Sequence, residues 1–201
     1  MGRTMNLEIE AKMRLEGTAV LAAGLAALGA RCEGKVLQRN DYYDTPDRRL
    51  RRQGQGLRVR VEHGPDRDVL GVVLTYKGPR RPGPLKTRPE TELRVDDAAA
   101  AADLLEALGH QRVFSFEKRR ETWRLNNCHV EIDTLPLLGC FVEIEGPDEK
   151  AVLDTRQHLG LGDEPLIAEG YFGLLRKYMK DNDLMTDTVI FEDEGKEARR
   201  E

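Results

Sequence analysis

The sequence Leu7-Glu8-Ile9-Glu10-Ala11-Lys12 alternates apolar and charged residues near the start of the chain. Successive side chains of a β-strand point to opposite faces, so Glu8, Glu10 and Lys12 share one face and the apolar residues between them share the other. The same alternation recurs in five further segments, at residues 57–61, 87–95, 116–124, 130–133 and 141–145. This recurrence predicts a sheet with one apolar and one charged face.

The charged face carries both signs, and two arrangements can accommodate it. A flat sheet would expose the charges to solvent, as antiparallel sheets commonly do. A sheet that curls would place them around a water-filled interior. The alternation alone leaves both arrangements open. In either case we expect the apolar faces to form the core, from Ile9, Leu57, Val59, Val61, Leu93, Trp123, Val130, Ile132, Val142 and Ile144.

Length and composition narrow the class of protein. A chain of 201 residues can bury a core without cross-links, and a net charge of −4 does not indicate a nucleic-acid binder. Its three cysteines show no paired ligand spacing, which favours reduced thiols over disulfides or a zinc site. No segment has the pattern of a signal peptide or a membrane-spanning helix. We therefore expect a cytoplasmic protein that binds neither nucleic acid nor a membrane.

Four helices are predicted between and after the strands, at residues 19–28, 98–108, 148–159 and 169–178. Thr18 and either Asp96 or Asp97 are candidate N-caps, while Gly29 and Gly109 are candidate stops. We expect residues 1–180 to form one domain and the acidic and polar residues 181–201 to form a disordered tail. The basic run at residues 48–52 is interpreted as a solvated loop.

A weak internal repeat favours a closed sheet. Glu8-x-Glu10-x-Lys12 precedes the first predicted helix and Glu90-x-Glu92-x-Arg94 precedes the second, and both helices end in Ala-Leu-Gly. Two such halves can pair their edges around a pseudo-twofold axis and leave no exposed edge. Buried ion networks are poor sources of stability, so an interior of both signs indicates a binding site. Metal-bound triphosphates need both signs, because the metal prefers carboxylates and the phosphates prefer Lys and Arg.

Seven segments in order along the chain resemble the CYTH superfamily, the triphosphate tunnel metalloenzymes, from about residue 7 to residue 178. They are Glu8-x-Glu10-x-Lys12, Leu57-Arg58-x-Arg60, Thr75-Tyr-Lys77-Gly-Pro79, Arg88-x-Glu90-x-Glu92, Glu117-Lys118-x-Arg120, Glu131-x-Asp133 and Gly139-x-Phe-Val-Glu143-x-Glu145. The resemblance implies an α+β fold in which eight antiparallel strands close into a barrel around a tunnel, with helices packed outside.

The resemblance also implies roles for individual residues. The implied ligands of Mg²⁺ or Mn²⁺ are Glu8, Glu10, Glu143 and Glu145. The implied phosphate-binding residues are Lys12, Arg58, Arg60, Lys77, Arg88, Lys118 and Arg120. The implied catalytic residues are Glu8, Glu10, Lys12, Glu90 and Asp133, where Glu90 and Asp133 are candidates for a second metal or for orienting the nucleophile. Supporting ion pairs are expected from Glu92, Arg94, Arg124 and Glu131.

The family covers more than one reaction. In class IV adenylyl cyclases the ribose 3′-hydroxyl of ATP attacks the α-phosphorus, which gives cyclic AMP and pyrophosphate. In the triphosphatases water attacks inorganic triphosphate, thiamine triphosphate or a nucleotide. The segment 108–120 and the spacing from Lys118 to Glu143 look most similar to the cyclases, whereas the acidic pairs Glu90/Glu92 and Glu143/Glu145 suit triphosphatases. We take the cyclase as the first expectation, hydrolysis as the second and a non-catalytic polyphosphate-binding barrel as the third. Dimerisation stays open.

Overall fold

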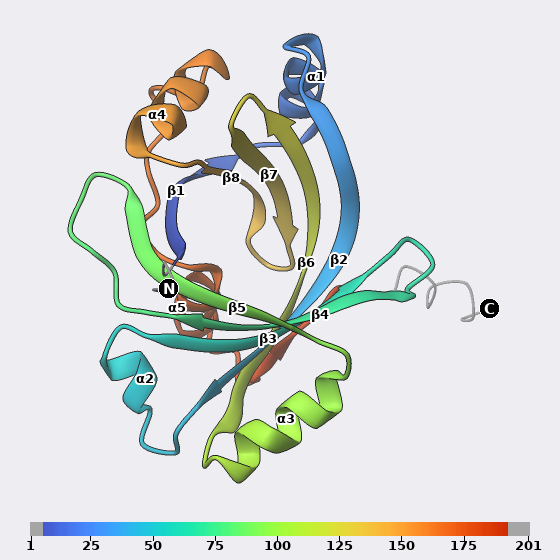
Figure 1. The fold of residues 1–201 in the computed structure, drawn as a ribbon, viewed down its shortest axis with the longest axis vertical. Coiled ribbons are helices and arrows are strands. Elements are labelled where there is room, and N and C mark those ends of the chain that lie inside the picture. Colours follow the sequence, from blue (N-terminus) through green and yellow to red (C-terminus); the bar gives the residue numbers. More distant parts are fainter. Residues whose placement is uncertain (1–5, 193–201) are drawn as a thin grey trace, which may run out of the picture.

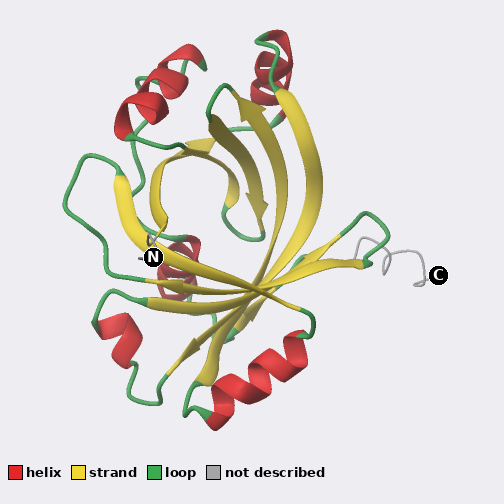
Figure 2. Cartoon of the chain, in the orientation of Figure 1, coloured by secondary structure: helices red, strands yellow, loops and turns green. Residues whose placement is uncertain are grey.

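A computed structural model of the chain describes residues 6–192. Figures 1 and 2 show one curved sheet with the helices arranged around it. The strands are β1 (Asn6–Leu15), β2 (Arg31–Asp44), β3 (Gly56–His63), β4 (Val69–Lys77), β5 (Lys86–Val95), β6 (Gln111–Leu125), β7 (Cys128–Leu135), β8 (Gly139–Glu145) and β9 (Thr188–Val189). The helices are α1 (Ala19–Ala27), α2 (Arg49–Arg52), α3 (Ala98–Ala107), α4 (Glu149–His158) and α5 (Tyr171–Asp181).

The sheet closes into a barrel of eight antiparallel strands. The order is β2-β3-β4-β5-β1-β8-β7-β6, and β6 pairs back with β2. Closure removes the free edges that an open sheet would expose. The structure therefore confirms the curled arrangement and excludes the flat sheet.

The topology also contains the predicted repeat. The order strand, helix, strand occurs as β1-α1-β2 in one half and as β5-α3-β6 in the other. The two halves join where β1 pairs with β5 and where β2 pairs with β6, so corresponding strands meet at both seams. This arrangement is the pseudo-twofold symmetry that the paired motifs predicted.

Most of the hydrophobic core lies outside the barrel, between the sheet and the helices. One cluster joins the outer faces of β1, β7 and β8 to α1 and α4, and includes Ile9, Val142 and Ile144. A second cluster joins the outer face of β3 to α3 through Val59 and Leu105. The strand residues of both clusters occupy the apolar positions of the alternating pattern. Leu93, which was expected in the core, is instead 56% exposed.

A third apolar cluster lies inside one end of the barrel and was not predicted. The inward faces of β6 and β8 change from charged to aromatic there, at Phe114, Phe116 and Phe141. Leu175 and Met179 of α5 pack against this aromatic end. Helix α5 therefore closes one end of the barrel interior, and the charged residues occupy the remainder.

The four predicted helices are present, with ends that differ from prediction by no more than three residues. Asp97 and Asp148 cap α3 and α4 with side-chain hydrogen bonds to backbone N–H groups, whereas Thr18 makes no such bond at α1. Gly29 and Gly109 adopt φ values of +76° and +85° after their helices, a conformation that glycine accommodates without strain.

Two expectations need correction. Part of the basic run forms the short helix α2, and Asp44, four residues before the run, accepts hydrogen bonds from the N–H groups of Leu50 and Arg51. The expected tail begins later than residue 181, because β9 pairs in parallel with β6 and buries Val189. The rest of that expected tail, residues 193–201, lies outside the described residues.

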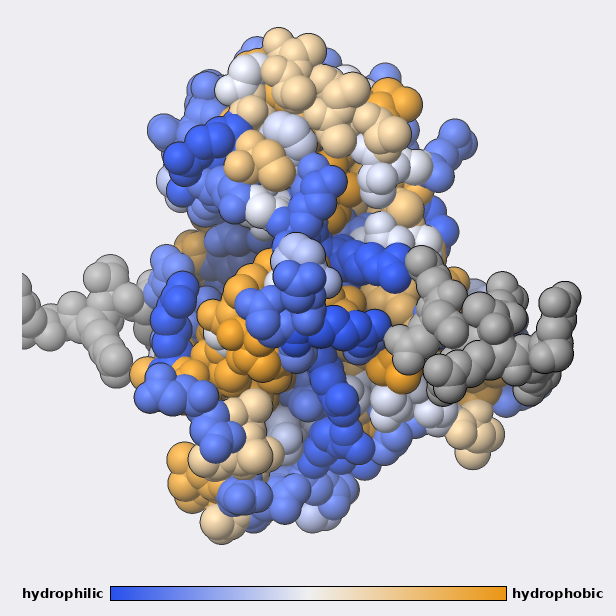
Figure 3. All heavy atoms as spheres, turned by 90° about the vertical axis from the view of Figure 1, so that its right-hand side faces the viewer, coloured by the Kyte–Doolittle hydropathy of each residue, from blue (hydrophilic) through white to orange (hydrophobic). Residues whose placement is uncertain are grey.

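The outer surface mixes polar and apolar residues. On the face drawn in Figure 3, hydrophobic residues form patches between hydrophilic ones. This agrees with a composition in which 34% of residues are charged and 39% are hydrophobic. Within residues 6–192 no helix is long and apolar enough to span a membrane.

Candidate active site

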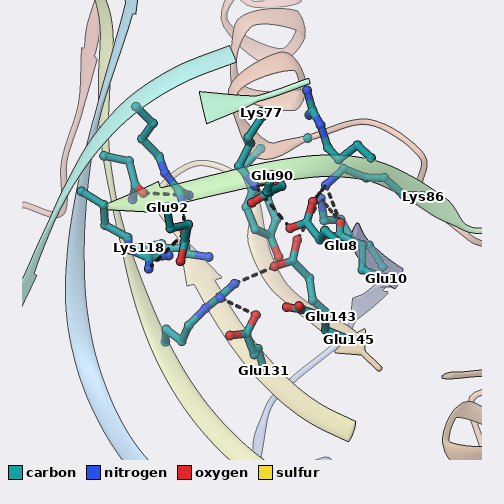
Figure 4. A pocket seen from close by; sticks show the side chains of 18 of the residues that line it. Glu8, Glu10, Lys77, Lys86, Glu90, Glu92, Lys118, Glu131, Glu143 and Glu145 are labelled. Atoms are coloured by element: carbon teal, nitrogen blue, oxygen red, sulfur yellow. Dashed lines mark hydrogen bonds and ion pairs between the residues drawn. The ribbon is translucent and has the colours of Figure 1, made fainter. Parts of the chain in front are cut away.

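A cavity of about 490 Å³ lies inside the barrel and is lined from all eight strands. Figure 4 shows its labelled side chains pointing toward one another from opposite walls. Among the described residues that line it, eight are Lys or Arg and seven are Glu. These are Lys12, Arg58, Arg60, Lys77, Lys86, Arg88, Lys118, Arg120, Glu8, Glu10, Glu90, Glu92, Glu131, Glu143 and Glu145.

Two lysines hold the carboxylates of β1 and β5 together. Lys77 Nζ lies 3.3 Å from Glu8 Oε1 and also pairs with Glu90. Lys86 Nζ lies 2.6 Å from Glu10 Oε1 and 4.0 Å from Glu8 Oε2. Strand register places these groups together, since Glu10 is opposite Lys86 and Glu90 is opposite Lys77. This wall is rich in carboxylate oxygens, with lysine as the counter-charge.

The wall formed by β3 carries guanidinium groups. Arg58 Nη2 donates to Thr75 Oγ1 at 3.2 Å and lies 3.6 Å from Glu92 Oε1. Arg60 Nη2 is 3.9 Å from the same Glu92 oxygen. Glu92 therefore contacts both guanidinium groups, and Arg60 Nε also lies 3.3 Å from Glu62 Oε1. Planar guanidinium donors suit bidentate contacts with phosphate oxygens.

Asp133 lies at the centre of a buried network behind the cavity wall. Arg120 donates to its two oxygens from Nε at 2.7 Å and from Nη2 at 2.6 Å. Lys118 Nζ and the Tyr171 hydroxyl donate to Oδ2 at 3.0 and 2.9 Å. The side chain of Asp133 is 0% exposed and does not line the cavity. Its contacts therefore fix the two cations, and it has no face toward a ligand.

Glu143 performs the same task from inside the cavity. Its two oxygens lie 3.0 Å from Lys12 Nζ and 2.6 Å from Arg120 Nη2. Burial acts to raise the pKa of Glu143, but the neighbouring Lys12, Lys118 and Arg120 outweigh it and hold that pKa well below its usual range. Lys12 also lies 4.2 Å from the ring centroid of Tyr171, which is the first residue of α5.

Two groups in the cavity have pKa values far from their usual range. Burial, followed by the repulsion of Glu131 and Glu8, raises the pKa of Glu145 to about 8. Burial, followed by the repulsion of Arg120, lowers the pKa of Lys118 to about 8. Glu145 therefore faces a surplus of carboxylates, whereas the pKa of Lys118 falls mainly because its ammonium is buried.

Comparison with known proteins agrees with this geometry. The family model described as "CYTH domain" matches residues 6–171. A protein of Aeromonas hydrophila named adenylate cyclase CyaB is 33% identical over 155 residues, which cover 76% of this chain and 76% of that protein. The chain belongs to the CYTH domain family. Two solved structures share its fold.

The first is a candidate adenylate cyclase from Vibrio parahaemolyticus, with a TM-score of 0.74, 20% identity and coverage of 85% of this chain and 98% of that chain. The second is a candidate adenylyl cyclase from Hippeastrum that is described as revealing a dominant triphosphatase activity. Its TM-score is 0.65 at 18% identity, with coverage of 85% of this chain and 95% of that chain. At these identities the likeness concerns the fold alone.

The structure brings together all but one of the site residues that the CYTH resemblance implied. Asp133 is the exception, because it is enclosed behind the cavity wall. Arg88 lines the cavity, but its Nε and Nη2 donate to the carbonyl oxygens of Gly78 and Gly54 at 2.6 to 3.2 Å. Arg88 therefore ties two loops together at the cavity wall.

The carboxylates fit the divalent metal that the CYTH family implies. Glu8 Oε2 is buried without a hydrogen-bond partner, and Glu145 is surrounded by other carboxylates. Within residues 6–192 no three His, Cys, Asp or Glu side chains already surround one point, because Lys77 and Lys86 lie among them. Mg²⁺ needs only one or two protein carboxylates when phosphate oxygens and water complete its shell, so the donor set is sufficient.

The seven segments that resemble the CYTH family do not include two residues of the site, Lys86 and Tyr171. Lys86 precedes the second acidic motif and enters the cavity because β1 and β5 pair in a register that places it opposite Glu10. Tyr171 comes from α5, which reaches the barrel from a distant part of the chain. The strand alternation of 86, 88, 90 and 92 contained a signal for Lys86, whereas no local pattern indicated Tyr171.

Proposed function

We propose that this protein is an enzyme that uses Mg²⁺ or Mn²⁺ to convert ATP to cyclic AMP and pyrophosphate inside the barrel. The observation that supports it most is that one cavity inside the barrel is lined by seven glutamates and by eight lysines or arginines. A metal-bound triphosphate needs both kinds of side chain at once. The name of the Aeromonas hydrophila relative supports the choice of cyclisation.

Glu8, Glu10 and Glu145 would hold the metal ion. Glu143 is less suited to binding the metal than the CYTH resemblance implied, because Lys12 and Arg120 each contact one of its two oxygens. When bound, the metal offsets negative charge that develops on the phosphate oxygens. Lys77 and Lys86, which contact Glu8 and Glu10, would turn from these carboxylates to the phosphates.

The cations of the opposite wall would bind and orient the triphosphate. Arg58 and Arg60 both contact Glu92, and Arg60 also pairs with Glu62 through Nε; their remaining N–H groups would donate to phosphate oxygens. Lys118 and Arg120 are held rigidly by Asp133, which limits the reorganisation needed when substrate binds. In this reaction the ribose 3′-oxygen forms a bond to the α-phosphorus, and the bond to the bridging oxygen of the β-phosphate breaks. Pyrophosphate leaves with that electron pair, and the hydroxyl proton passes to solvent or a carboxylate.

A second candidate is hydrolysis of a triphosphate by water. Its support in this chain is the pair Glu90 and Glu92, which both line the cavity and add carboxylates beyond a single metal site. The fold neighbour from Hippeastrum, described by its triphosphatase activity, also favours it. The barrel as a passive polyphosphate binder is the third candidate.

The unpaired cysteines, Cys32, Cys128 and Cys140, support the proposed cytoplasmic location, where thiols stay reduced.

Product analysis separates these candidates. The purified protein is incubated with Mg²⁺ or Mn²⁺ and with ATP, inorganic triphosphate or thiamine triphosphate in separate reactions, and the products are identified by chromatography. Cyclic AMP with pyrophosphate supports the proposal, and orthophosphate without cyclic AMP supports hydrolysis. The double variant Glu8→Gln/Glu10→Gln should lose nearly all turnover, whereas Glu106→Gln on the exposed surface of α3 should retain it. Tight triphosphate binding with no product would leave only the passive binder.

A further inference from the structure

The pairing of β4 with both of its neighbouring strands ends at Lys77. The last pairs are Gly56 with Lys77 on the β3 side and Lys77 with Glu90 on the β5 side. The Lys77 ammonium nevertheless lies between two carboxylates of the cavity, 3.3 Å from Glu8 and paired with Glu90 (Figure 4). Because the strand pairing does not hold the chain beyond Lys77, another contact has to fix the backbone from which this side chain extends.

The guanidinium of Arg88 supplies that contact at the next residue, Gly78. Its Nε and Nη2 both donate to the Gly78 carbonyl oxygen, at 3.0 and 2.6 Å. The N–H of Gly78 donates in turn to the carbonyl oxygen of Pro89 at 2.8 Å. Two consecutive residues of β5 therefore hold Gly78 on both sides, and hydrogen bonds from a charged group are stronger than those between neutral groups.

The approach of β5 to this point requires glycine at position 78. A Cβ on Gly78 would lie 2.6 Å from Pro89 Cγ and 3.3 Å from the Pro89 carbonyl oxygen. Any side chain would therefore push the end of β4 away from β5. The glycine and the arginine together keep the two strands close directly after Lys77.

The same guanidinium reaches the loop that leads into β3. Arg88 Nη2 also donates to the Gly54 carbonyl oxygen at 3.2 Å, two residues before Gly56, the strand partner of Lys77. Gly54 has a φ of +68°, a conformation that glycine adopts without strain. One side chain therefore fixes the backbone on both sides of the Gly56–Lys77 pair, at the end of the β3–β4 pairing.

We propose that Arg88 is a positioning residue for Lys77: it fixes the backbone from which the Lys77 ammonium reaches the phosphates. The CYTH resemblance implied instead that Arg88 binds phosphate. Carbonyl oxygens already accept hydrogen bonds from Nε and Nη2, so a phosphate would have to compete with them for these donors. This inference rests on the proposed function, in which Lys77 turns from its carboxylates to the substrate.

A double-mutant cycle tests the proposal. The dissociation constant of inorganic triphosphate is measured by calorimetry with Mg²⁺ for full-length wild type, Arg88→Ala, Lys77→Ala and the double variant. Arg88→Ala is expected to weaken binding by about tenfold in the wild-type background but by less than about twofold in the Lys77→Ala background, where no ammonium is left to position. Gly78→Ala disturbs the same backbone without changing the guanidinium, and its effect should depend on Lys77 in the same way.

A second cycle with Lys118→Ala is the matched control. Lys118 is a cation of the same cavity, but it lies on β6 and donates to Asp133. In this background Arg88→Ala should still weaken binding by about tenfold. Arg88→Lys keeps the charge but cannot reproduce the planar fork of donors, so it should bind as weakly as Arg88→Ala, and it replaces that variant if Arg88→Ala does not unfold cooperatively in urea.

Each other result overturns the proposal. An equal loss from Arg88→Ala in the wild-type and Lys77→Ala backgrounds, or recovery of affinity in Arg88→Lys, would identify Arg88 as a direct phosphate ligand. An Arg88→Ala protein that loses stability in urea but binds triphosphate like wild type would show a purely structural role. Failure of the wild-type protein to bind triphosphate would instead overturn the proposed function itself.

Discussion

Replacing Asp133 by Asn tests whether this carboxylate fixes the cations of the cavity. The side chain is 0% exposed and accepts hydrogen bonds from Arg120, Lys118 and Tyr171 at 2.6 to 3.0 Å. Asn keeps the shape but removes the charge, so two buried cations lose their main partner. Breaking a buried ion pair from one side costs about 3–5 kcal/mol. We therefore expect urea denaturation to show a free energy of unfolding lower by about that amount.

Tyr171→Phe is the matched control for this prediction. It removes one hydrogen bond to the same carboxylate and leaves the ion pairs intact, so the expected loss is about 1.5–3 kcal/mol. Inorganic triphosphate should restore more stability to Asp133→Asn than to wild type, because the released Lys118 and Arg120 would gain an anionic partner. An Asp133→Asn protein within about 1 kcal/mol of wild type would refute the assignment of a fixing role to Asp133.

Three further predictions concern the cavity, a close contact and the closed end of the barrel. Burial and Arg120 lower the pKa of Lys118 to about 8, so the Lys118 ammonium is lost as pH rises through that value. The variant Glu145→Gln, studied with a chelator, removes the other group whose pKa is about 8. In this variant the triphosphate affinity measured by calorimetry should fall by about tenfold per pH unit above pH 8, and adding Lys118→Arg should abolish the fall. A pH slope unchanged by Lys118→Arg would contradict this. Gly146→Ala should lower the free energy of unfolding by about 1–3 kcal/mol in urea, because its Cβ would lie 2.8 Å from Cys128 Sγ and 3.0 Å from Val152 Cγ2, whereas Gly17→Ala, with nothing within 4 Å, should not. Leu175→Ala should cost about 2–5 kcal/mol in the same assay, because this α5 residue is 0% exposed within the aromatic end; a cost below about 1 kcal/mol would show that α5 does not close the barrel.

The fold and most of the cavity were predictable because strand alternation has a period of two. Glu8, Glu10 and Lys12 had to share a face, and the paired motifs around Glu90 predicted that two halves join. The family resemblance then indicated that this face is the interior. These features depend on local sequence, which a single chain contains in full.

Other features depend on contacts between distant segments. Lys86 enters the site through the register of β1 with β5, and Asp133 lies behind the wall because Arg120 and Tyr171 enclose it. Strand β9 exists through its pairing with β6, whereas helix α2 depends on a short-range contact with Asp44, six residues before Leu50. Tertiary contacts decide the placement of Lys86, Asp133 and β9, where composition had indicated a tail from residue 181 and the CYTH resemblance had implied a catalytic role for Asp133.

The most direct test of the central claim is the anomalous difference map of a crystal of the protein with Mn²⁺ and a non-hydrolysable triphosphate analogue. The carboxylates and cations that line the cavity predict a manganese peak beside Glu8, Glu10 and Glu145, with the phosphates extending toward Arg58, Arg60 and Lys118. A well-ordered analogue bound on the outer surface, with neither metal nor phosphate density inside the barrel, would contradict the claim.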